Sequence, residues 1–147
     1  MTQQKTEVNS DEPQVRAVIS LVKLPESGDP YLEGLKCNSC DTVFTTRRAH
    51  CPSCFARNSM EPQKLAHTGV IHTYTIIRRT FPGIEVPFIS TIVDLDGGGV
   101  LKGNLINVEA EPENIPFGGK VNVVFGDALG RKNKKGDSFI SYFFELA

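Results

Sequence analysis

The sequence lacks the features that mark membrane and secreted proteins. No run approaches the roughly 20 consecutive apolar residues that a membrane-spanning helix needs. Residues 1–13 are polar and contain no apolar core of the kind that a signal peptide requires. We therefore expect a cytoplasmic protein, made under reducing conditions in which disulfides rarely persist.

A surplus of charge of either sign is also missing. The 147 residues include 16 Lys and Arg against 17 Asp and Glu, which gives a net charge of -1. Proteins that bind nucleic acid on their own are usually basic, so this balance weighs against that class. The class stays open as an alternative, because the two kinds of domain predicted below, a zinc ribbon and an OB-fold barrel, both bind nucleic acid in other proteins.

Recognisable catalytic motifs are absent as well. The sequence has no G-x-S-x-G motif, and none of its three histidines belongs to an H-E-x-x-H motif. All four cysteines fall in two C-x-x-C pairs, which leaves no spare cysteine as a nucleophile. A nucleophile, its base and an orienting group cannot be assembled from the remaining residues. We therefore expect that the protein is not an enzyme on its own.

The two C-x-x-C pairs predict a metal site. The pairs are separated by ten residues, and each forms a tight turn whose two thiolates can face one ion. Four thiolates select zinc or iron and leave no open coordination position for chemistry. The alternative is two redox disulfides, which a reducing compartment disfavours. We therefore predict a structural Zn²⁺ site in a rubredoxin-like ribbon, with the ligands Cys37, Cys40, Cys51 and Cys54.

The remainder of the chain has the pattern of an all-β domain. Five runs are rich in Val, Ile, Thr, Phe and Tyr and are separated by Gly and Pro: residues 70–80, 88–95, 100–105, 120–125 and 138–146. Five strands in about 80 residues suit a closed OB-fold barrel, with a five-stranded sandwich fragment as the alternative. The last run is apolar on both faces, so we expect an N-terminal helix or a partner subunit to cover its outer face.

The segment before the cysteines is expected to form a tail, a helix and a linker. Ser10, two acids and Pro13 resemble a helix start, and apolar residues recur at helical spacing up to Val22. The same residues also alternate, which leaves a strand as the alternative. The predicted organisation is a tail, possible helix and linker over residues 1–30, a zinc ribbon over 31–62 and an OB-fold domain over 63–147, with a barrel core separate from the ribbon.

In this order, the motifs resemble the family of acyl-CoA-associated OB-fold proteins with an N-terminal rubredoxin-like zinc ribbon. The resemblance runs from Tyr31 to about Phe144, and it rests on residues 35–54, 69–75, 87–99 and 117–125. It implies a non-catalytic subunit of a thiolase-type complex, a hetero-oligomer in which this chain stabilises the catalytic subunit and helps to bind the CoA thioester. The alternative within the family is a scaffold that links acyl-CoA enzymes without touching substrate.

A CoA ligand would need fixed cations for its pyrophosphate and ribose phosphate. Arginine is favoured, because its planar fork matches two phosphate oxygens. Two basic segments are available, one between the cysteine pairs and one on a glycine-bounded loop that we expect to be flexible. A solvated hairpin tip is the alternative for the loop. The candidate phosphate-binding residues are Arg47, Arg48, Arg131, Lys132, Lys134 and Lys135.

Overall fold

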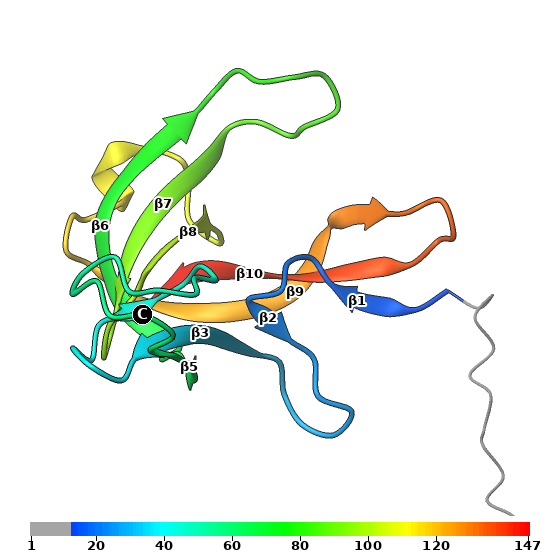
Figure 1. Cartoon of the computed structure of the whole chain (residues 1–147). Helices are drawn as coiled ribbons and strands as arrows, with labels where there is room; N and C mark the ends of the chain where they lie inside the picture. Colours follow the sequence, from blue (N-terminus) through cyan, green and yellow to red (C-terminus); the bar gives the residue numbers. More distant parts are fainter. Residues whose placement is uncertain (1–12) are drawn as a thin grey trace, which may run out of the picture.

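The computed structural model describes residues 13–147, which form two β-sheets and one short 3-10 turn (Figure 1). One sheet builds a barrel with a projecting arm, and the other builds a small ribbon packed beside it. The part of the chain that the structure describes has no helix long and apolar enough to cross a membrane.

Five strands close the barrel: β6 (Thr68–Ile77), β7 (Phe88–Leu95), β8 (Val100–Leu105), β9 (Lys120–Lys132) and β10 (Ser138–Leu146). β6, β7 and β8 form an antiparallel meander, and β9 returns to pair with β6. β10 is antiparallel to β9 and parallel to β8, which closes the circle. The 3-10 turn η1 (Pro112–Asn114) lies between β8 and β9. The mainly β fold with a five-stranded barrel is thereby confirmed.

The barrel core follows from strict alternation along its strands. In β7 every second residue is buried, from Ile89 to Leu95, as expected for a strand with one face inside. Phe144 of β10 has 0% of its surface exposed and pairs with Leu105 of β8 at the seam of the barrel. The seam is completed by a hydrogen bond that the Ile106 N–H donates to the Phe144 carbonyl at 2.8 Å.

The zinc ribbon is the second sheet, formed by β2 (Val22–Lys23), β3 (Tyr31–Cys37), β4 (Val43–Phe44) and β5 (Met60–Lys64). β3 is its centre and pairs with all three other strands. Leu32 of β3 and Leu65 are buried in the same hydrophobic cluster as the barrel residues. The expectation of a separate barrel core was therefore wrong, because apolar side chains at the base of the ribbon pack directly on the barrel.

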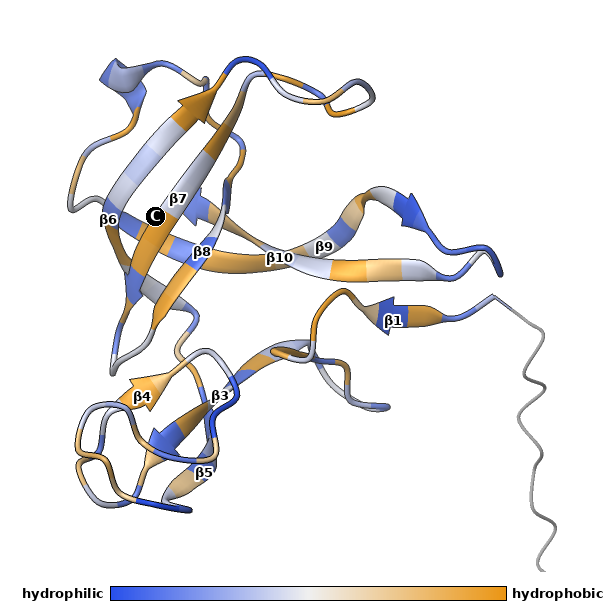
Figure 2. Ribbon diagram, turned by 45° about the horizontal axis from the view of Figure 1, so that its top comes forward, coloured by the Kyte–Doolittle hydropathy of each residue, from blue (hydrophilic) through white to orange (hydrophobic). Residues whose placement is uncertain are grey.

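β9 and β10 continue beyond the barrel as an arm, clearly visible in Figure 1. The arm contains a wide bulge, because Ile140 pairs with Asp127 whereas Ser138 pairs with Lys132. β1 (Val15–Ala17) adds to the arm as a third strand, parallel to β10. Figure 2 shows an apolar stretch of β10 in the arm, beside β1.

The N-terminal helix expected after Ser10 is not found in the described residues. Residues 15–17 form the strand β1 instead, while positions 10–12 lie outside the described residues. The free edge of β10 in the arm offers backbone partners: the Ser138 N–H donates to the Gln14 carbonyl and the Val18 N–H to the Ile140 carbonyl, both at 3.0 Å. Pairing with a distant strand thus outweighs the local helical spacing. It also satisfies part of the hydrogen-bonding edge of the last strand.

Candidate functional site

The four cysteines lie on two matching turns, which we call the first knuckle (residues 37–41) and the second knuckle (residues 51–55). In the first, the Asp41 N–H donates to the Cys37 carbonyl at 2.9 Å; in the second, the Phe55 N–H donates to the Cys51 carbonyl at 2.9 Å. Asp41 and Phe55 both have positive φ, 63° and 64°. The two turns therefore have the same backbone geometry and present their thiols in the same way.

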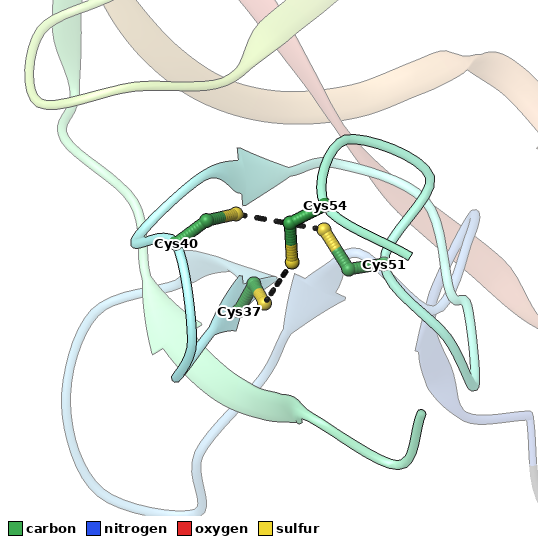
Figure 3. Close-up of side chains that lie close together, drawn as sticks. All are labelled: Cys37, Cys40, Cys51 and Cys54. Carbon is green, nitrogen blue, oxygen red and sulfur yellow. Dashed lines mark hydrogen bonds between the residues drawn. The ribbon is translucent and has the colours of Figure 1, made fainter. Parts of the chain in front are cut away.

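The four sulfur atoms converge on one point, as Figure 3 shows. All four lie within 4.8 Å of one another, and the shortest separations join the two knuckles: 3.7 Å from Cys37 to Cys54 and 3.6 Å from Cys40 to Cys51. A tetrahedron with metal–sulfur bonds of about 2.3 Å has edges of about 3.8 Å. A disulfide would need about 2.05 Å. The arrangement therefore fits a tetrahedral zinc ion, and all four cysteines are free thiols with no disulfide between them.

Hydrogen bonds and neighbouring thiols set different pKa values for the cysteines. The Ser59 hydroxyl, 3.3 Å from the Cys37 sulfur, lowers the pKa of that thiol to about 6. The Thr42 hydroxyl lowers the pKa of Cys40. At Cys54 a hydrogen bond from the Ala56 backbone lowers the pKa, but burial and the other thiols outweigh it and raise the value to about 11. A bound cation is what would allow all four to ionise together.

His50 has a structural contact in the second knuckle. Its Nδ1 accepts a hydrogen bond from the Asn58 N–H at 3.1 Å, and its backbone pairs with that of Arg57. The cluster of possible metal ligands contains the four cysteines without His50. His50 thus stabilises the loop that follows the second knuckle.

Arg47 and Arg48 lie on the loop between the knuckles. Arg47 lines a cavity of about 300 Å³ between the N-terminal segment and the ribbon, together with Ile19, Leu21, Gly34, Leu35 and Pro62. The Arg48 guanidinium lies 5.9 Å from the centre of the Phe44 ring. Neither arginine forms an ion pair with a carboxylate of the described residues, so both are available to an anionic ligand.

The basic loop at the tip of the arm forms a turn with side-chain hydrogen bonds of its own. Asn133 accepts hydrogen bonds from the Lys135 and Asp137 N–H groups at 2.9 and 3.0 Å. Asp137, of which 1% is exposed, accepts bonds from the Asn133 side chain at 2.8 Å and from Arg16 at 2.7 Å. Sequence reasoning missed this carboxylate, whose only sequence signal is an Asn four positions before an Asp in a glycine-bounded turn.

The two basic segments line different cavities. Arg131 lines a different cavity, of about 180 Å³, with Leu129, Tyr142 and Phe143. Figures 1 and 2 both show the tip of the arm on the far side of the molecule from the knuckles. The two cavities are lined by consecutive residues of the N-terminal segment, Ile19 in the first and Val18 in the second.

Two family models match the chain. The rubredoxin-like zinc ribbon domain of ChsH2 matches residues 28–61, and the C-terminal OB-fold domain of ChsH2 matches residues 62–126. A DUF35 domain-containing scaffold protein of Methanothermobacter thermautotrophicus is 30% identical over 117 residues, which cover 78% of this chain and 84% of that protein. A scaffold protein of the same description from Methanocaldococcus jannaschii is 30% identical over 96 residues, covering 64% and 67%.

Solved structures show the same fold. A chain of the structure entitled "Ltp2-ChsH2(DUF35) aldolase" superposes with a TM-score of 0.63 at 22% identity, over 79% of this chain and 84% of that one. A DUF35-family protein of unknown function from Sulfolobus solfataricus superposes with a TM-score of 0.50 at 18% identity, over 78% and 75%. At these identities the likeness shows that the ribbon and barrel architecture is shared.

Proposed function

Because this chain belongs to the DUF35 family, we propose that it is a non-catalytic subunit of a thiolase-type acyl-CoA enzyme complex. The observation that carries the proposal is the 30% identity across 84% of a DUF35 domain-containing scaffold protein. The fold shared with a chain of an aldolase complex supports the same role. In this proposal the subunit stabilises the catalytic subunit and helps to hold its CoA thioester.

The zinc ion is proposed as a structural element of this subunit. Cys37, Cys40, Cys51 and Cys54 would hold it, and a bound zinc with four thiolates has no open position for substrate. Its contribution would be to join two knuckles that have little core of their own. The loop with Arg47 and Arg48, which connects the knuckles, would thereby be fixed in place.

The reactive groups would come from the partner. All four thiols of this chain belong to the metal cluster. Within residues 13–147 the one histidine–carboxylate pair is His72 with Asp94, 2.9 Å apart, and both side chains are largely exposed. A general base usually stands within hydrogen-bond reach of a nucleophile in a sheltered site. A cysteine of the catalytic subunit is therefore proposed as the nucleophile.

The Arg47 cavity is the proposed position of the CoA head. It combines an unpaired guanidinium with apolar side chains and the hydroxyl groups of Ser20, Thr45 and Thr46, which suits the phosphates and the adenine of a nucleotide. Glu33 also lines the cavity, and its carboxylate lies 4.0 Å from the Lys23 ammonium group. Arg48 follows directly in sequence and adds a second cation to the same loop. The arm loop, whose Arg131 lines a different cavity, would then contact solvent or the partner.

Co-purification tests the subunit assignment. The tagged full-length chain, purified from its native host, is expected to retain a thiolase-type catalytic subunit in a stable stoichiometric complex. Treatment with nuclease should leave that complex intact. Recovery of the chain as a monomer bound to RNA would refute the proposal and would favour the nucleic-acid-binding alternative.

Substitution of the arginines tests the CoA contact. Arg48→Ala, and likewise Arg47→Ala, is expected to weaken CoA-ester binding to the complex by about 1–3 kcal/mol, the scale of a charge-assisted hydrogen bond. The complex should still assemble. Arg79→Ala is the matched control, because it removes the same charge from an exposed site on the barrel. If the Michaelis constant is unchanged in these variants and in a variant that lacks Arg131, Lys132, Lys134 and Lys135, the partner binds CoA alone and this chain is a scaffold.

A further inference from the structure

Phe55, at the end of the second knuckle, has an unfavourable backbone conformation for its residue type. Among residues 13–147, five residues other than glycine have positive φ: Asp41, Phe55, Asn58, Asn107 and Leu129. Three of them are Asp or Asn, whose short polar side chains tolerate the left-handed region. A bulky aromatic residue at φ 64° is a genuine exception. Such an outlier is a reason to look for a function.

The first knuckle shows what the backbone alone requires at this position. Asp41 is the structural equivalent of Phe55, since each residue donates its N–H to the carbonyl of the first cysteine of its pair. Glycine, asparagine or aspartate satisfies such a turn with little strain. The phenylalanine is therefore not explained by the geometry of the knuckle.

Packing does not explain the side chain either. Phe55 is 82% exposed, more than any other large hydrophobic residue that the structure describes. It belongs to neither the hydrophobic core nor the residues packed against it, and its ring stacks on no other aromatic ring of the described chain. Phe55 thus costs backbone energy without joining a hydrophobic cluster of residues 13–147, which makes it a candidate for contact with a partner.

The charge around Phe55 indicates what kind of partner that is. Residues 42–60 contain three arginines and His50 but no Asp or Glu. Arg57 and Arg48, like Arg47, lack a carboxylate partner among residues 13–147. An aromatic ring flanked by free arginines is the composition of a binding hot spot in protein interfaces. A second copy of this chain would bring like charges together, which disfavours self-association here.

We propose that the second knuckle docks on the catalytic subunit, with the Phe55 ring in an apolar pocket whose rim is acidic and contacts Arg57. This inference rests on the proposed function, because it assigns the surface through which that complex assembles. Nucleic acid fits less well, since bases along a strand need several stacking platforms and this loop offers one exposed ring.

Phe55→Gly separates docking from folding. Glycine relieves the positive φ, so the melting temperature of the isolated variant should stay equal or rise by roughly 2–4 °C. Its affinity for the catalytic subunit that co-purifies with the wild-type chain should fall roughly tenfold or more. Phe55→Ala should lose the same affinity. Asp41→Gly is the matched control: it places glycine at the equivalent position of the first knuckle and should leave the affinity unchanged.

The outcomes distinguish this inference from the proposed function. A wild-type chain that binds no thiolase-type subunit refutes the proposed function, and the docking assignment with it. A wild-type chain that binds, with Phe55→Gly binding equally well, refutes the docking assignment alone. A Phe55→Gly variant that melts several degrees lower or loses its metal would show that the ring is structural, which also overturns the assignment.

Discussion

Replacing Gly103 by alanine is expected to destabilise the barrel at its seam. Gly103 lies in β8, where a Cβ atom would stand 2.8 Å from a ring carbon of Tyr142 and 2.9 Å from one of Phe144. Both separations are shorter than real Cβ contacts, and Phe144 is completely buried, so its ring has no room to move. Overpacking of this kind costs about 1–3 kcal/mol. In an ordinary strand, alanine would instead gain about 0.5–1 kcal/mol over glycine.

The net expectation is a loss of about 1–2 kcal/mol, seen as a fall in melting temperature of roughly 2–8 °C. Thermal and urea unfolding of the zinc-loaded chain measure it. Gly126→Ala in β9 is the control, because its Cβ would meet only a ring carbon of Phe143 at 3.8 Å, an ordinary contact. A Gly103→Ala variant as stable as wild type, or more stable, would refute the tight closure of β8 on β10.

Two further predictions concern the metal. Cys37→Ser and Cys54→Ser should each release about one zinc ion per chain, because metal binding and folding of the ribbon are coupled. Elemental analysis measures the zinc content, and a variant that retains full zinc would contradict the ligand assignment. Removal of zinc by a chelator should also lower the stability of the barrel, since Leu32 and Leu65 share its core. Unchanged unfolding of the barrel after chelation would show that the ribbon and the barrel are independent.

Local sequence patterns were sufficient for the ribbon and for most barrel strands. The predicted strands over residues 88–95 and 100–105 coincide with β7 and β8, and the run over 138–146 coincides with β10. Pro87 directly precedes β7, Gly99 directly precedes β8 and Gly136 lies two residues before β10, so turn residues mark where each strand begins. The convergence of the four sulfur atoms was predicted from the cysteine spacing, because each C-x-x-C pair places two thiols on one tight turn.

Features that depend on distant pairing could not be predicted in the same way. β9 was expected to end at residue 125, but it continues to Lys132 because β10 pairs with it beyond the barrel. The segment around Val15 became a strand because β10 offered a free edge. The separation of Arg47 from Arg131 depends on the direction of the arm, which no local pattern encodes.

The contacts of Asp137 predict that electrostatic interactions help to fix β1 to the arm. Its carboxylate accepts hydrogen bonds from the Gln14 N–H at 2.8 Å, from Asn133 and from Arg16, and these contacts lower its pKa below the ordinary 3.8. A lowered pKa in the folded state means that the charged form stabilises the fold above pH 4 or so, and that this contribution is lost as the pH falls through the folded-state pKa.

Asp137→Asn keeps the size of the side chain but removes the charge and one acceptor. Its melting temperature should therefore lie below that of the wild type at neutral pH, and the gap between the two should shrink as the pH falls below about 4. Acid also protonates the zinc thiolates, but it does so in both proteins, so the difference between them isolates Asp137. Hydrogen exchange at the Ser138 N–H, which bonds to Gln14, should be faster in the variant at neutral pH. A gap that is absent at neutral pH, or constant down to acid pH, would mean that backbone pairing alone holds β1 on the arm.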